Sequence, residues 1–153
     1  MGRAGIVPSP VAILDKIAKG KAIAERAESS CVTCHRIGAV GADFGPGLSE
    51  ISAKLPKEAI YDAIVNPNAG VTMGFETTQL ALKDGGAAMG FVRSETAQEV
   101  VLALPGGATQ KFAKANIAKR DKLATSMMPS GLNQAFTQDD LVNLVEYLAS
   151  LKK

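Results

Sequence analysis

The chain has 153 residues, of which 46% are hydrophobic and 21% are charged, and its formal net charge is +2. This size and balance predict a single globular domain that spans residues 1–153. No apolar run approaches the roughly 20 residues that a membrane-spanning helix needs, and the slight basic excess does not indicate a nucleic-acid partner. We therefore expect neither a membrane span in this chain nor binding to nucleic acid.

We expect a short irregular stretch at the start of the chain, followed by a helix. Residues 1–8 lack the apolar core of a secretory signal, so we interpret them as a tag or linker. Residues 9–29 are predicted to be helical because apolar side chains recur near the helical period. Gly20 either separates two short helices or permits close contact with another helix. The recurring apolar residues are Ile13, Leu14, Ile17 and Ile23.

Both cysteines and the only histidine of the chain lie in one segment, Cys-Val-Thr-Cys-His at residues 31–35. Cysteines three positions apart on one helical turn point the same way, so both sulfurs can reach the two vinyl groups on one edge of a porphyrin. The histidine that follows offers a ring nitrogen to the iron. This spacing is the attachment signature of a c-type haem. It predicts one haem c bound through Cys31 and Cys34, with His35 as the proximal ligand.

Other kinds of site built on two cysteines fit this segment less well. A structural zinc site needs four Cys or His ligands, usually in two separated pairs, and this chain supplies only three. A thioredoxin-like redox pair lies between a strand and a helix, whereas helical sequence precedes this segment and a Gly-rich loop, residues 38–47, follows it. A disulfide across two residues would be strained and would leave the histidine unexplained.

After the Gly-rich loop, the pattern predicts one further helix and then a small sheet. The helix covers residues 56–65, where Pro56 suits the first turn and Asn66-Pro67 ends it. From about residue 75 to 113, strand formers alternate with turns, which predicts three or four antiparallel strands. No cluster of titratable groups marks these strands, so we expect them to have a structural role. The turns are Asp84-Gly85-Gly86 and Pro105-Gly106-Gly107.

The last helix has the strongest start signal. Thr137 is a good N-cap, and Asp140 occupies the capping-box position three residues later. The apolar side chains that follow form one face, which we expect to pack on the first helix. They are Leu141, Leu144, Tyr147, Leu148 and Leu151.

A haem that carries electrons needs a second axial ligand, and the chain has no second histidine. Methionine is the remaining candidate. Met128 is the best placed, because Pro129 disfavours helical geometry at the residue before it and so holds Met128 extended in a loop. The alternative, from the residues alone, is that Met127 and Met128 fill gaps in the core. The other candidates are Met73 and Met89.

Taken together, these segments resemble a class I cytochrome c. The features that carry the likeness are the motif at residues 31–35, the stretch Gly45-Pro46-Gly47-Leu48, and Met128-Pro129 before a Leu-rich terminal helix. More narrowly, the chain is similar to the C-terminal haem-binding domain of large planctomycete and verrucomicrobial multidomain proteins. That narrower likeness comes from the inserted strands, from Ile64-Val65-Asn66-Pro67-Asn68 and from Met127-Met128-Pro129-Ser130-Gly131-Leu132.

The resemblance implies both a fold and a set of contacts around the haem. The fold would be mainly α, a class I cytochrome c fold with a small antiparallel sheet, residues 75–113, inserted between the second main helix and the methionine loop. Met128 would be the distal ligand. The Pro46 carbonyl would accept a hydrogen bond from His35 Nδ1–H, and Leu48 would pack against the porphyrin.

With both axial positions filled, the iron would not be accessible to a substrate, so we expect one-electron transfer rather than enzyme catalysis. The alternatives are a gas sensor or peroxidase-like domain with a labile distal ligand, and an interaction module that binds no haem. The resemblance implies redox protein partners or a dehydrogenase domain on the same parent chain. Haem attachment of this kind occurs outside the cytoplasmic membrane, so we expect a periplasmic or otherwise extracytoplasmic location, with the leader absent from this chain.

Overall fold

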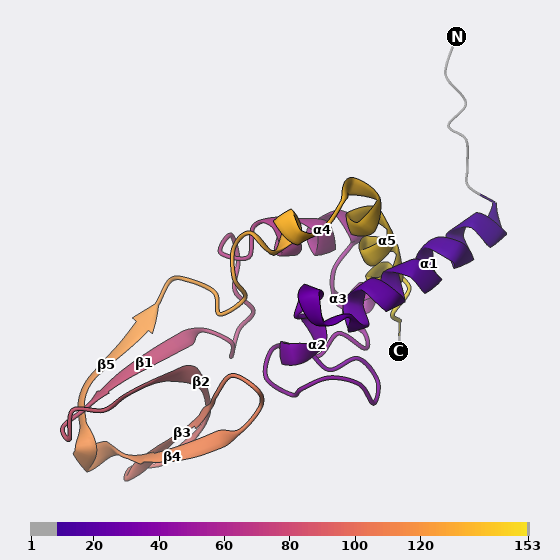
Figure 1. Ribbon diagram of the computed structural model, residues 1–153. Helices are drawn as coiled ribbons and strands as arrows, with labels where there is room; N and C mark the ends of the chain where they lie inside the picture. The colour runs from indigo at the N-terminus through magenta and orange to yellow at the C-terminus, as the bar shows by residue number, and fades with distance from the viewer. Residues whose placement is uncertain (1–8, 153) are drawn as a thin grey trace.

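The computed structural model describes residues 9–152, and it consists of a group of helices and a curved sheet (Figure 1). The predicted tag or linker, residues 1–8, lies outside the described residues. Helix makes up 38% of the structure and strand 24%. The prediction of a mainly α protein is therefore wrong, because five antiparallel strands form a substantial second part of the molecule.

The first and last helices pack across one another, as predicted. Helix α1 (Pro10–Glu25) runs through Gly20 without interruption, and helix α5 (Gln138–Ala149) crosses it. A Cβ added at Gly20 would lie 2.0 Å from the carbonyl oxygen of Asn143 in α5. Of the two roles expected for Gly20, close helix contact is therefore the correct one.

Helix α5 starts with the predicted capping box. The Thr137 hydroxyl accepts a hydrogen bond from the Asp140 N–H at 3.0 Å, and the Asp140 carboxylate accepts one from the Thr137 N–H at 3.1 Å. The second hydrogen bond, with the nearby charge of Arg26, holds the pKa of Asp140 below its ordinary value. The helix then turns four side chains into the core: Leu144, Val145, Tyr147 and Leu148.

Three short helices complete the helical part. They are α2 (Cys31–Cys34), α3 (Ile51–Lys54) and α4 (Lys57–Val65), accompanied by the 3₁₀ turns η1 (Ala27–Ser29) and η3 (Leu132–Ala135). Helix α4 is the one predicted at residues 56–65, with Pro56 as its N-cap. None of the helices within residues 9–152 is long and apolar enough to cross a membrane. The buried core of this part consists of Ile23, Ala24, Ile37, Ile60, Ile64, Leu144, Val145, Tyr147 and Leu148.

The sheet has five antiparallel strands in the order β4-β3-β2-β1-β5. The strands are β1 (Thr77–Leu82), β2 (Ala87–Glu95), β3 (Glu99–Ala103), β4 (Thr109–Ala113) and β5 (Ile117–Leu123). The 3₁₀ turn η2 (Lys114–Asn116) joins the two edge strands, β4 and β5, so the sheet coils on itself (Figure 1). It thereby encloses a separate core of buried residues: Leu80, Val100, Leu102 and Phe112.

The sheet is larger than the sequence pattern predicts. The two Gly-containing turns separate strands as expected, but the sheet continues past residue 113 to Leu123. The pattern does not reveal β5, because residues 119–122 at its centre are all charged. An edge strand tolerates such residues, since its outer side faces solvent and charges there oppose pairing with other chains.

Candidate functional site

Helix α2 brings the two cysteines of the motif onto one turn, which the His35 N–H closes by donating to the Cys31 carbonyl at 2.8 Å. Both thiols are half-buried and free rather than joined in a disulfide. Cys31 packs against the helical core, whereas Cys34 packs against a second cluster that contains Phe44 and Phe91. Burial raises the pKa of both thiols, so they stay protonated at neutral pH.

The ring of His35, which directly follows α2, is oriented by a backbone carbonyl. Nδ1 lies 2.6 Å from the Pro46 oxygen. Nδ1–H therefore donates, and the lone pair is left on Nε2. Burial lowers the pKa of His35, and the hydrogen bond to Pro46 opposes that effect only in part. The ring is thus neutral, which is the form that binds a metal. The structure contains the contact to Pro46 that the resemblance implied.

The loop after the motif passes close to the His35 ring. The Gly45 N–H donates to the Cys34 carbonyl at 2.6 Å, and the Leu48 N–H donates to the Arg36 carbonyl at 2.9 Å. A Cβ added at Gly45 would lie only 2.9 Å from Cε1 of the histidine. Glycine at this position is what lets the loop backbone approach the ring so closely.

The four candidate methionines lie in different settings. Met73 is 90% exposed in a loop, and Met89 is 42% exposed on strand β2. Met127 and Met128 are both half-buried in the segment between strand β5 and the η3 turn. Only the second pair is packed against the clusters that contain the motif cysteines.

Met127 and Met128 pack into different clusters. Met128 packs against the helical core, as do Cys31 and Leu48. Met127 packs instead into the cluster that contains Cys34. The two neighbouring side chains therefore have different surroundings: Met128 packs with Cys31 and Leu48, and Met127 packs with Cys34.

An aromatic cluster of Phe44, Phe75 and Phe91 joins the motif to the sheet. Phe44, in the loop after the motif, stacks on Phe91 of strand β2 with ring centroids 4.5 Å apart, and Phe75 meets Phe91 edge-on at 5.4 Å. The Arg93 guanidinium donates to the Phe44 carbonyl at 3.1 Å. The sequence pattern does not predict this cluster, because its members are far apart in the chain and carry no motif chemistry.

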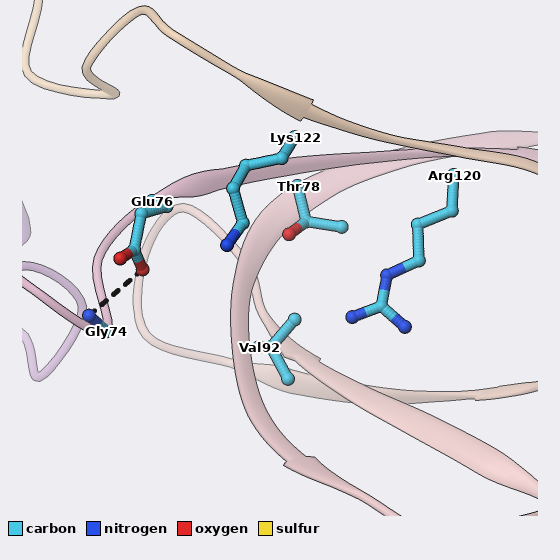
Figure 2. Close-up of a pocket in the computed structure, with 6 residues that line it drawn as sticks. All are labelled: Gly74, Glu76, Thr78, Val92, Arg120 and Lys122. Atoms are coloured by element: carbon cyan, nitrogen blue, oxygen red, sulfur yellow. Dashed lines mark hydrogen bonds between the residues drawn. The ribbon is translucent and has the colours of Figure 1, made fainter.

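A separate hollow of about 180 Å³ lies in the sheet and contains none of the motif residues. Figure 2 shows the residues that line it: Gly74, Glu76, Thr78, Val92, Arg120 and Lys122. Arg120 pairs with Glu95, and Glu76 accepts a hydrogen bond from the Gly74 N–H at 3.0 Å. The hollow is thus lined by charges of both signs, and Arg120 is already paired.

The residues of the motif suit covalent haem better than a bare metal ion. Within residues 9–152, no three His, Cys, Asp or Glu side chains are gathered where they could hold a metal ion together. Two thiols on one helical turn could form the thioether bonds of a c-type haem, and an imidazole with a free Nε2 directly after them could bind its iron.

Comparison with known proteins agrees with this geometry. The sequence model of one family, cytochrome c, matches residues 17–102, which is more than half of the chain. The matched residues include the motif and strands β1 and β2, and the match ends before Met128. A search of curated proteins finds no match.

Proposed function

The chain belongs to the cytochrome c family, and from this premise we propose that it is an electron carrier whose haem iron is bound by His35 and Met128. The family has a haem c attached covalently to the two cysteines of its motif, here Cys31 and Cys34. When bound, the haem supplies a one-electron Fe(III)/Fe(II) couple. Haem-based electron transfer follows from the family, and the identity of the two axial ligands is the proposal.

The observation that carries this proposal is the hydrogen bond between His35 and Pro46. Because the Pro46 oxygen accepts the Nδ1 proton, Nε2 keeps the lone pair that a metal needs. Gly45 lies against the same ring, so the ring is confined by the loop as well as by the hydrogen bond. A histidine oriented in this way is a preorganised ligand, and the hydrogen bond also makes Nε2 more basic.

Met128 is the proposed distal ligand because of where it packs. It packs against the helical core, as do Cys31 and Leu48, while its neighbour Met127 packs against the cluster of Phe44 and Phe91, as does Cys34. Pro129 keeps the backbone of Met128 out of helical geometry. A thioether is a neutral donor, which favours reduced iron and raises the potential relative to two histidines.

Replacing Met128 with alanine tests this ligation. We expect M128A to lose the Met–Fe(III) charge-transfer band of the oxidised protein, because no thioether remains to bind the iron. Its reduction potential should be lower than that of the wild type for the same reason. Optical spectroscopy and a redox titration measure the two quantities. Met73→Ala is the control, since Met73 is 90% exposed, and it should change neither. A band that persists in M128A would mean that another residue is the ligand.

Binding of CO separates an electron carrier from a sensor or peroxidase-like domain. In a carrier, both axial positions are occupied, so CO can bind the reduced protein only after the distal ligand leaves. We therefore expect slow CO binding to the wild type and fast binding to M128A. Equally fast binding to both proteins would favour the alternative of a labile distal ligand.

The partners and the location are further parts of the proposal. An electron carrier exchanges electrons with redox proteins, and we propose a respiratory protein or a dehydrogenase domain on the same parent chain. The second option is supported by the resemblance to the planctomycete and verrucomicrobial multidomain type. Cytochrome c domains are typically extracytoplasmic, which supports a periplasmic location. The stacking of Phe44 on Phe91 and the hydrogen bond from Arg93 to the Phe44 carbonyl join the helical part to the sheet, which supports our proposal that the chain is one domain, residues 1–153.

A further inference from the structure

The loop that carries Met128 runs from residue 125 to 130 and has no regular secondary structure beyond turns. It is tied at its start to the sheet, since the buried Thr77 hydroxyl donates to the Thr125 carbonyl at 3.0 Å. Within the loop, the Met128 N–H donates to the Ser126 hydroxyl at 3.1 Å. The position of Met128 therefore depends on side-chain hydrogen bonds rather than on a helix or a strand.

One side chain, that of Asn68, reaches this loop from the segment that follows helix α4. The Ser126 N–H donates to Asn68 Oδ1 at 2.7 Å, and Asn68 Nδ2 donates to the Ser130 hydroxyl oxygen at 3.0 Å. Met128 lies midway between these two partners in the sequence. One amide group thus bridges the two ends of the segment that carries the methionine.

Asn68 is exposed, and the two residues before it have restraints of their own. Helix α4 ends at Val65, and the Asn66 amide then donates to the Asp62 carboxylate at 2.8 Å. Pro67, between the two asparagines, is buried and has a fixed φ. The partners of the Asn68 amide fix its orientation. The Ser126 N–H is a donor, so it must face the amide oxygen, and the amide nitrogen then faces the Ser130 hydroxyl.

We propose that Asn68 positions Met128 as the distal ligand and restrains it from leaving the iron. This assignment rests on the proposed function, in which Met128 binds the iron. For the thioether to withdraw, the segment between Ser126 and Ser130 must shift, and that movement strains or breaks the hydrogen bonds to Asn68. Without those bonds, the withdrawn conformation is populated more often.

Asn68→Leu removes both hydrogen bonds and keeps a side chain of similar size. In haem-loaded N68L, we expect CO to bind the reduced protein about thirtyfold faster than in the wild type, which is roughly the equilibrium factor for the two neutral hydrogen bonds that it loses. On warming, the Met–Fe(III) charge-transfer band should disappear at a lower temperature. Asn66→Leu is the matched control, because Asn66 is also exposed but bonds to Asp62 and not to the methionine loop. It should bind CO at the wild-type rate.

Two further variants separate positioning from a general loss of stability. Asn68→Asp should restore slow CO binding, because a carboxylate accepts hydrogen bonds from both the Ser126 N–H and the Ser130 hydroxyl. Ser130→Ala removes one of the two bonds and should give a rate between those of the wild type and N68L. A purely structural role would lower the denaturation midpoint of N68L and leave its CO binding unchanged.

The outcomes distinguish this assignment from the ligation on which it rests. If M128A loses its charge-transfer band while N68L binds CO at the wild-type rate, the assignment of Asn68 is wrong and the ligation stands. If M128A keeps the band, Met128 is not the ligand and both proposals are wrong. Faster CO binding in N68L, together with wild-type rates in N66L and N68D, would support the assignment.

Discussion

At the residue scale, the His35 ring leaves no room for a side chain at Gly45. A Cβ at this position would lie 2.9 Å from Cε1 and 3.1 Å from Nδ1 of His35. The ring cannot easily move aside, because Pro46 holds Nδ1. Gly47, two residues further on, has open space where its Cβ would lie. The space around residue 45 therefore requires a glycine, whereas the space around residue 47 does not.

Gly45→Ala is expected to lower the free energy of unfolding of the haem-loaded protein by about 1–3 kcal/mol. That is the usual cost of forcing an extra carbon into filled space. Gly47→Ala is the matched control and should stay within about 0.5 kcal/mol of the wild type. Denaturant titration of the three proteins measures the difference. Equal stability of G45A and G47A would show that the ring does not constrain residue 45.

At the scale of the elements, helices α1 and α5 can cross this closely because residue 20 is a glycine and has no side chain. A Cβ at Gly20 would meet the Asn143 carbonyl oxygen at 2.0 Å and Cβ of Tyr147 at 2.7 Å. The Asn143 oxygen is a backbone atom, so no change of side-chain rotamer can relieve this clash. The helices would have to separate, and they bury much of the core of the helical part between them.

Gly20→Ala should therefore destabilise the protein by about 2 kcal/mol. Overpacking costs about 3 kcal/mol, and the better helix propensity of alanine offsets about 1 kcal/mol of it. Gly70→Ala is the control, because a Cβ at Gly70 would have nothing within 4 Å. Thermal or denaturant unfolding measures both variants. A G20A protein as stable as the wild type would mean that the helices do not approach this closely.

The elements that sequence patterns predict well are those with local signals. The Thr137–Asp140 capping box fixes the start of α5, and Pro56 and Asn66-Pro67 bound α4. Strand β5 has no such signal, because its charged centre is a pattern typical of a loop. The segment forms a strand because it pairs with β1. The fold class is wrongly predicted as mainly α because the sheet is longer than its local pattern indicates.

At the scale of the whole molecule, the site joins segments that are distant in the chain. The sequence points to the cysteines and His35 because these residues are consecutive. It does not reveal the contacts of Asn68, which bonds to partners 58 and 62 residues away. Nor does it point to the stacking of Phe44 on Phe91, which attaches the sheet to the loop beside the motif. Such contacts exist only once the chain has folded.

The covalent attachment of haem to Cys31 and Cys34 is the claim on which every other assignment depends. The mass of the unfolded chain, measured after expression with haem-attachment machinery, tests it most directly. We expect the mass of the polypeptide plus one haem, because thioether bonds survive denaturation. The mass of the polypeptide alone, with no haem retained on unfolding, would contradict the attachment.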